Sequence, residues 1–231
     1  MLSVHGRKPA AVVIEPIARG LCKLGITPNM VTLTGTILAI GFALWLIPTN
    51  HHFAAAALIG LTVATDMVDG TMARMRGGGT KFGATLDATC DRLTDGAIFG
   101  ALAFWFAIKE EPNEVLMALC LVILVSSQVT SYVKARAEAS GIKVIGGLIE
   151  RPERLIIGLL SLGLDGLGVP YVLAGGLWVL CAGSIYTVIE RLVIVGKSDA
   201  AAERIEAPTG AREFSSPNQM NSDDQTVEDH R

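Results

Sequence analysis

The chain has 231 residues, of which 51% are hydrophobic and 18% are charged, and its mean hydropathy is +0.48. This composition is too apolar for an ordinary soluble domain. The net charge is −3, and we expect no nucleic-acid partner.

The apolar residues form long runs, each near the ~20 residues that a helix needs to cross about 30 Å of hydrocarbon. We therefore predict an all-α integral membrane protein. Six transmembrane helices are expected at residues 30–47, 53–75, 82–108, 115–137, 152–164 and 171–195, the fifth being the shortest. The N-terminus lacks the apolar core and cleavage site of a signal peptide, so the first span is expected to drive insertion.

Residues 9–29 precede the first predicted span and carry apolar side chains at helical spacing. Ile17 and Leu21 belong to this apolar set, whereas Glu15 and Arg19 lie on another side. The pattern predicts an amphipathic helix in the plane of the membrane interface, ended by a Pro-Asn turn. The alternative is an ordinary helix packed on the bundle.

Lys and Arg residues alternate between the two sides of this layout. They gather in the N-terminal segment, in the second and fourth connections and after the sixth helix, whereas the opposite connections hold only Lys109. Because basic residues collect in cytoplasmic loops, both termini are expected in the cytoplasm, with the protein in the cell membrane.

The C-terminal segment, residues 197–231, holds four basic and eight acidic residues and shows no apolar period. We predict that it is disordered. The domain prediction is thus an N-terminal segment at 1–29, a transmembrane domain at 30–196 and an acidic tail at 197–231.

Carboxylates stand inside two of the predicted spans. Asp66 and Asp69 are three residues apart, and Asp87 and Asp91 are four apart, so each pair shares one helix face. Ionised residues inside a membrane are costly and usually functional. Four opposed carboxylates repel one another unless a hard cation is bound, and oxygen ligands suit Mg²⁺ or Mn²⁺.

The structural alternative is that these aspartates form ion pairs with nearby basic residues, namely Arg74, Arg76, Lys81 and Arg92. Ion pairs with basic residues could account for one aspartate, but they are less able to neutralise four carboxylates on two helix faces. Asp95 lies one turn further along, and for it we favour hydrogen bonding within the bundle.

The stretch from Asp66 to Asp91 resembles the signature of the CDP-alcohol phosphotransferase family, D-x-x-D-G-x-x-A-R followed by G-x-x-x-D-x-x-x-D. All eight fixed positions match: Asp66, Asp69, Gly70, Ala73, Arg74, Gly83, Asp87 and Asp91. The resemblance extends over about residues 8–196.

The resemblance implies an enzyme that cleaves the diphosphate of a CDP-linked lipid with a pair of divalent ions, Mg²⁺ or Mn²⁺. It implies that Asp66, Asp69 and Asp87 are metal ligands, and that Asp91 is a ligand, the general base, or both. Gly70, Ala73 and Arg74 would then face the cytidine diphosphate. Members of the family are commonly homodimers.

Several basic residues stand at the cytoplasmic ends of the predicted helices and indicate an anionic acceptor: Lys134, Arg151, Arg154 and Arg191. Membrane topology alone could also place them there. The segments at 76–92, 131–141 and 146–155 resemble actinobacterial phosphatidylinositol phosphate synthases, which transfer the phosphatidyl group of CDP-diacylglycerol to inositol phosphate. This implies that Lys134, Arg154 and Arg191 bind the acceptor phosphate, with Arg151 as an alternative to Arg154.

Two other functions stay open on the sequence. The same chemistry could use glycerol 3-phosphate as the acceptor, since that molecule is also anionic. A divalent-cation transporter would also carry intramembrane carboxylates, but here no carboxylate continues toward the far side of the membrane.

Overall fold

The structure is a computed structural model that describes the backbone of residues 7–203 and the side chains of residues 14–203. Every regular element in these residues is a helix, which confirms the predicted all-α class. The predicted acidic tail from residue 204 onward lies outside the described residues.

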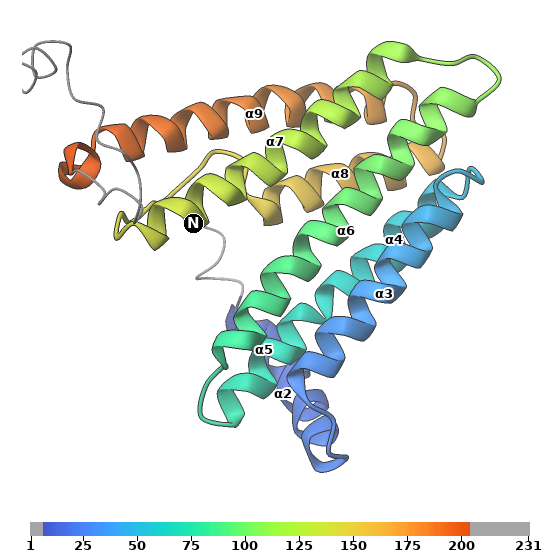
Figure 1. The fold of residues 1–231 in the computed structure, drawn as a ribbon. Helices are drawn as coiled ribbons and strands as arrows, with labels where there is room; N and C mark the ends of the chain where they lie inside the picture. Colours follow the sequence, from blue (N-terminus) through green and yellow to red (C-terminus); the bar gives the residue numbers. More distant parts are fainter. Residues whose placement is uncertain (1–6, 204–231) are drawn as a thin grey trace, which may run out of the picture. The chain divides into compact units, whose positions relative to one another are not determined.

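Eight α-helices follow one another along the described chain (Figure 1). They are α2 Arg7–Lys23, α3 Pro28–Leu46, α4 His52–Ala64, α5 Asp66–Met75, α6 Lys81–Ile108, α7 Glu114–Ala139, α8 Arg151–Gly166 and α9 Val172–Gly196. The helices belong to one compact unit, and a 3-10 turn at Asp199–Ala202 belongs to another.

Side-chain caps explain where three of the helices begin. Thr27, Thr80 and Asn113 precede α3, α6 and α7, and each side chain accepts a hydrogen bond from the backbone N–H group three residues later. These bonds satisfy N–H groups that have no partner inside the helix. Pro28 adds to the start of α3, because proline is tolerated in the first turn of a helix.

The predicted single helix at 53–75 is divided at Thr65 into α4 and α5. The Thr62 hydroxyl donates to the Ile59 carbonyl at 2.7 Å, and the Thr65 hydroxyl donates to the Thr62 carbonyl at 2.5 Å. Such bonds compete with the helical backbone and often bend it. As a result, Asp66 and Asp69 lie in the first turn of a separate short helix.

Four helical segments among the described residues are both long and apolar enough to cross a membrane. They are Pro28–Leu46, His52–Met75, Glu114–Ala139 and Val172–Gly196. The predicted number of six is larger because α6, with 28 residues, carries several charges and α8 has only 16 residues. Six crossings therefore remain a prediction.

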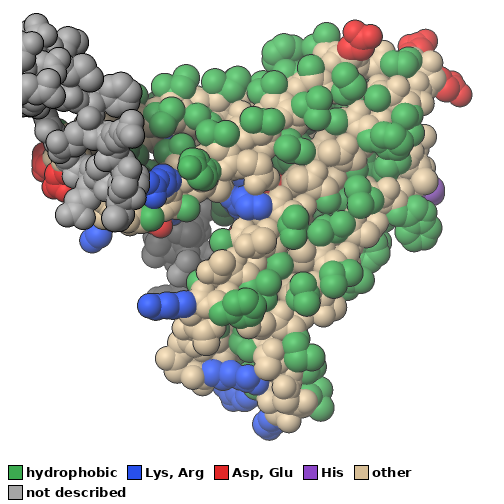
Figure 2. Space-filling model, viewed as in Figure 1, with side chains coloured by type: hydrophobic (Ala, Val, Ile, Leu, Met, Phe, Trp, Pro, Cys, Tyr) green, Lys and Arg blue, Asp and Glu red, His purple; other side chains and the backbone are tan. Residues whose placement is uncertain are grey.

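A large apolar core joins α3, α4, α6, α7, α8 and α9. Within it, α6 packs against α3 and α7, whereas α8 packs against α4 and α9. Many large apolar side chains point outward, as expected for helices surrounded by lipid. Figure 2 shows them over the visible face, with Lys and Arg side chains away from the end that carries the α6–α7 connection.

The helix predicted for the membrane interface is present as α2, and it packs against α5. Ala18 of α2 forms a buried cluster with Val68 and Met72. On this face, α2 is therefore an ordinary helix packed on the bundle, as the alternative interpretation predicts. Ile17 of α2 remains 50% exposed, so contact with the membrane interface stays a prediction for the other face of the helix.

Candidate active site

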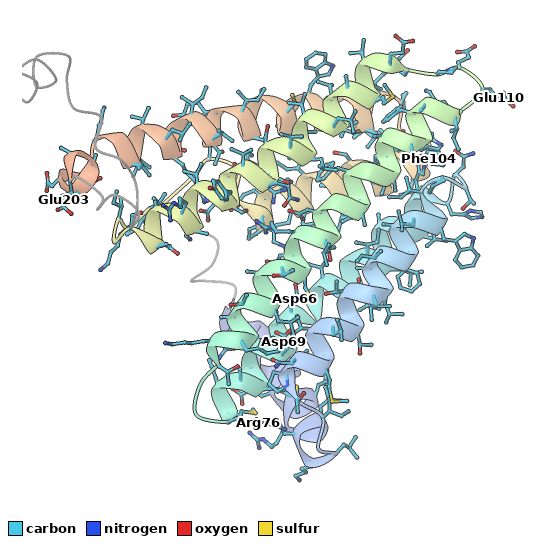
Figure 3. The ribbon with its side chains drawn as sticks, viewed as in Figure 1. Asp66, Asp69, Arg76, Phe104, Glu110 and Glu203 are labelled. Atoms are coloured by element: carbon cyan, nitrogen blue, oxygen red, sulfur yellow. The ribbon has the colours of Figure 1, made fainter. Side chains whose placement is uncertain are left out.

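The four signature aspartates lie on α5 and α6, and Figure 3 labels the two on α5, Asp66 and Asp69. Asp66 and Asp69 occupy the first turn of α5, and Asp87 and Asp91 lie one turn apart on α6. Asp66 and Asp91 contact the same guanidinium group, that of Arg151, and Asp69 and Asp87 line one cavity. The two carboxylate faces thus lie near each other, and their binding of a shared metal ion stays a prediction.

Asp69 is held by a residue that the sequence analysis did not identify. Its carboxylate accepts a hydrogen bond from the hydroxyl of Thr32 on α3, and its side chain is buried. The same hydroxyl contacts the Pro28 carbonyl at 3.1 Å. Thr32 lies 37 residues from Asp69, and no local pattern connects the two.

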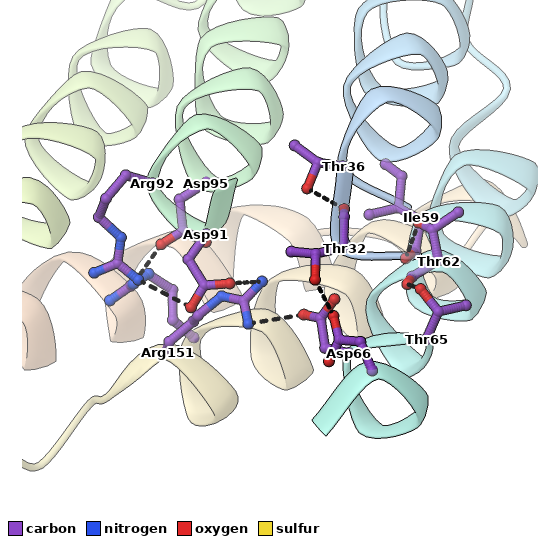
Figure 4. Close-up of polar contacts among 12 residues, drawn as sticks. Thr32, Thr36, Ile59, Thr62, Thr65, Asp66, Asp91, Arg92, Asp95 and Arg151 are labelled. Atoms are coloured by element: carbon purple, nitrogen blue, oxygen red, sulfur yellow. Dashed lines mark hydrogen bonds and ion pairs between the residues drawn. The ribbon is translucent and has the colours of Figure 1, made fainter. Parts of the chain in front are cut away.

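Arg151, the first residue of α8, lies between the two carboxylate helices (Figure 4). Its Nη1 is 3.1 Å from Asp66 Oδ2, and its Nη2 is 2.8 Å from Asp91 Oδ1. Arg92 is 3.7 Å from Asp91 Oδ2. Arg92 is one of the partners that the ion-pair alternative predicts, but the main partner of these aspartates is Arg151, which comes from a distant segment.

The donor chemistry of the cluster fits a hard divalent cation, because all four groups are carboxylates and one cationic group already contacts two of them. In the described part of the chain, no three His, Cys, Asp or Glu side chains are arranged as a complete ligand set. Metal binding therefore requires the carboxylates to turn from their present partners toward a shared ion.

Asp95 forms an ion pair with Arg154 of α8, with Nη2 to Oδ2 at 2.5 Å. The two side chains are 0% and 2% exposed. The interpretation of Asp95 as a residue bonded within the bundle is confirmed. The pair also fixes Arg154, one of the predicted phosphate-binding residues, against α6.

A cavity of about 910 Å³, here called the basic cavity, lies between α6, α7 and the start of α8. All four basic residues predicted to bind the acceptor line it, together with Asp91 and Arg92. Its lining contains five basic and three acidic residues, so its net charge favours an anion: Arg92, Lys134, Arg151, Arg154 and Arg191 against Asp91, Glu138 and Glu150.

The basic residues differ in how they are held. Arg191 is 4% exposed and donates to Glu150 Oε1 at 2.7 Å and to the Thr130 carbonyl at 2.9 Å. Lys134, by contrast, makes no ion pair with any residue that the structure describes. Its ammonium group is therefore the most readily available to a ligand.

A second cavity, of about 470 Å³ and here called the carboxylate cavity, is lined by Asp69, Gly70, Ala73 and Asp87. Ala84 lines both cavities, so they meet at α6. Arg74 does not line this cavity. Its Nη2 donates to Thr71 at 2.8 Å.

Close packing explains why a glycine stands at position 83 of the signature. A Cβ atom at this position would lie 3.1 Å from Asn29 Oδ1 and 3.1 Å from Thr80 Oγ1. The glycine thus allows α6 to begin close to the start of α3, beside the carboxylate cavity.

Comparison with known proteins agrees with this geometry. The pattern of the CDP-alcohol phosphatidyltransferase family matches residues 25–189. The phosphatidylinositol phosphate synthase of Corynebacterium glutamicum is 59% identical over 212 residues, which cover 92% of this chain and 97% of that protein. The Mycobacterium tuberculosis synthase is 47% identical over 205 residues, covering 87% and 94%.

Two crystal structures of the Mycobacterium tuberculosis synthase share the fold. The structure with CDP-DAG bound has a TM-score of 0.82 at 47% identity and covers 85% of this chain and all of that one. The complex with manganese and citrate has a TM-score of 0.81 at 46% identity, covering 87% and 96%. The chain belongs to the CDP-alcohol phosphatidyltransferase family and is an enzyme of that class.

Proposed function

We propose that this enzyme transfers the phosphatidyl group of CDP-diacylglycerol to inositol phosphate, giving phosphatidylinositol phosphate and CMP. The observation that carries the proposal is the position of Asp91, which lines the same cavity as the four basic residues. That cavity meets the carboxylate cavity, which five other signature residues line: Asp69, Gly70, Ala73, Gly83 and Asp87. The names of the relatives and the CDP-DAG and manganese in the related structures support the proposal.

In this proposal Asp66, Asp69, Asp87 and Asp91 hold a pair of divalent ions, Mg²⁺ or Mn²⁺. When bound, such ions neutralise the charge that develops on a diphosphate as it is cleaved. The contact of Thr32 with Asp69 keeps that carboxylate on the α3 side of the cluster. Asp66 and Asp91 face each other across the Arg151 guanidinium.

The cytidine diphosphate is proposed to bind in the carboxylate cavity. Gly70 and Ala73 line this cavity with little or no side chain, so a ligand can approach the α5 backbone closely. Arg74 lies beside Gly70, since its Nη1 would be 3.6 Å from a Cβ atom placed there. A modest rotation of its side chain would bring it to the nucleotide.

The inositol phosphate is proposed to bind in the basic cavity, with its phosphate near Lys134, Arg154 and Arg191. Charge-assisted hydrogen bonds to a phosphate are roughly twice as strong as neutral ones. The buried contacts of Arg154 and Arg191 hold their guanidinium groups in place before the ligand arrives. Such preorganisation reduces the entropic cost of binding.

Asp91 is then placed to act as the general base. In the proposed step, a hydroxyl oxygen of the inositol attacks the phosphorus that carries the diacylglycerol. The bond from that phosphorus to the bridging oxygen of the diphosphate breaks, CMP leaves, and the hydroxyl proton passes to the Asp91 carboxylate. A carboxylate beside the acceptor can take this proton in the transition state.

We also propose that the protein crosses the cell membrane six times, with both termini and the active site facing the cytoplasm, and that it works as a homodimer. The uneven distribution of Lys and Arg supports the orientation. With 28 residues, α6 is long enough to cross the membrane. Its charged residues lie in the half that adjoins the two cavities, so they need not contact lipid.

The test is release of CMP from CDP-diacylglycerol by the purified protein in lipid nanodiscs. Inositol phosphate, free inositol and glycerol 3-phosphate would each be supplied with Mg²⁺, with Mn²⁺ or with EDTA. We expect rapid release only with inositol phosphate and a divalent ion, and a product with the mass of phosphatidylinositol phosphate. Faster release with glycerol 3-phosphate would contradict the acceptor assignment.

A further inference from the structure

One cationic side chain links the carboxylate cluster to the basic cavity. The guanidinium of Arg151 contacts Asp66 of α5 through one terminal nitrogen and Asp91 of α6 through the other, at 3.1 and 2.8 Å (Figure 4). Arg151 also lines the basic cavity beside Lys134. The same guanidinium therefore borders the two regions that the proposed function gives to metal and to acceptor.

The simultaneous contact of Arg151 with Asp66 and Asp91 depends on the planar, forked shape of the arginine guanidinium. Two donors in fixed geometry can reach two carboxylates on different helices, whereas an ammonium group is a single point charge. Arg151 is 20% exposed and its Nε is buried with no hydrogen-bond partner among the described residues. Burial strengthens the two ion pairs relative to pairs at a fully exposed surface.

A divalent ion shared by Asp66 and Asp91 would lie between the two carboxylates, where the Arg151 guanidinium now lies, and its charge would repel that group. The carboxylates cannot serve both cations in the same arrangement. We propose that Arg151 is the resident counter-ion of Asp66 and Asp91, that a divalent ion displaces it, and that the displaced guanidinium then binds an anion in the basic cavity. This inference rests on the metal-ligand assignment of the proposed function.

The consequence is thermodynamic coupling between metal and anion. Metal binding releases a cation into the basic cavity, so it increases the affinity of the enzyme for an anion there. By linkage, a bound anion increases the affinity for the metal by the same factor. Arg151 thus acts as a positioning residue that makes the acceptor site complete only after the metal has bound.

The experiment uses the full-length protein in nanodiscs and measures Mn²⁺ binding by titration calorimetry with and without inorganic sulfate. Sulfate is a tetrahedral dianion and does not depend on which alcohol the enzyme accepts. Wild type is compared with Arg151→Gln, with Arg151→Lys, and with Arg136→Gln, which removes an exposed charge of α7 outside the basic cavity.

We expect Arg151→Gln to bind Mn²⁺ about tenfold more tightly than wild type in the absence of sulfate, because the competing cation is gone. In wild type, sulfate should tighten Mn²⁺ binding by about fivefold or more, which is a typical coupling factor. This factor should fall close to one in Arg151→Gln and remain in part in Arg151→Lys. Arg136→Gln should behave as wild type.

Equal Mn²⁺ affinity in wild type and Arg151→Gln, with the sulfate effect retained, would overturn this inference alone. Failure of wild type to bind Mn²⁺ would overturn it together with the metal-ligand assignment. If Arg151→Gln does not fold, Arg151→Lys decides the matter: tighter Mn²⁺ binding with a reduced sulfate effect supports the inference, and wild-type values contradict it.

Discussion

Asp91 differs from Asp69 and Asp87 in the cavity that its side chain borders. It borders the basic cavity, whereas Asp69 and Asp87 border the carboxylate cavity. This position suits a group that meets the acceptor hydroxyl. Its two nearest cations, Arg151 and Arg92, come from different helices, and together they hold the carboxylate at the edge of the cavity.

Asp91→Asn should abolish CMP release while leaving nucleotide binding largely intact, because the amide cannot accept the proton but retains much of the shape. Turnover would be measured by CMP release, and CDP affinity by calorimetry with Mg²⁺. Glu110→Gln in the α6–α7 connection is the charge-matched control and should keep wild-type activity. Normal turnover of Asp91→Asn would refute the role of base.

Lys134→Gln should raise the KM for inositol phosphate far more than the KM for CDP-diacylglycerol. The loss of one charge-assisted contact should cost roughly 1.5–3 kcal/mol, or about one to two orders of magnitude in kcat/KM. The thermal midpoint should change little, since Lys134 makes no ion pair with the described residues. An equal rise in both KM values would argue against a contact with the acceptor phosphate.

At the scale of helices, the ion pair of Asp95 and Arg154 joins α6 to α8 in a fully buried setting. Asp95→Ala leaves a buried guanidinium without its partner, which typically costs about 3–5 kcal/mol of stability. We therefore expect a clear fall in the thermal midpoint of the purified protein. Glu110→Ala, in the α6–α7 connection, provides a comparison because that residue is exposed and makes no ion pair with a described residue. An unchanged midpoint for Asp95→Ala would show that the pair does not join the helices energetically.

Helix positions followed well from the sequence, since apolar runs, proline and polar breaks act locally. The break at Thr65 did not, because threonine is common in spanning helices and its effect depends on rotamer and neighbours. His52 is buried and bonded to Asp165, 113 residues away, at 2.6 Å. Contacts of this range have no local signal.

The candidate site likewise has features that the local sequence predicts and contacts between distant segments that it does not. The shared faces of Asp66 with Asp69, and of Asp87 with Asp91, are properties of single helices, and they predicted the cluster. The contacts of Thr32 and Arg151 depend on how α3 and α8 pack around it. Sequence reasoning placed Arg151 near an anion but could not show that it bridges two carboxylates.

The family match ends at residue 189, and the apolar core lies within the helices up to α9. Removal of residues 204–231 should therefore leave CMP release and the thermal midpoint nearly unchanged. The segment is polar and rich in acidic residues, so it offers little apolar surface for packing. A several-fold loss of activity in a well-folded truncated protein would show that the tail has a role in the reaction.

A competition reaction measures whether the enzyme prefers inositol phosphate to glycerol 3-phosphate as its acceptor. Equal concentrations of inositol phosphate and glycerol 3-phosphate would share one reaction with CDP-diacylglycerol and Mg²⁺, and the two lipid products would be measured by mass spectrometry. Their ratio reports the ratio of the two kcat/KM values. We expect phosphatidylinositol phosphate in at least about tenfold excess, or roughly 1.4 kcal/mol of discrimination. An equal yield of both lipids, or an excess of phosphatidylglycerol phosphate, would contradict this preference.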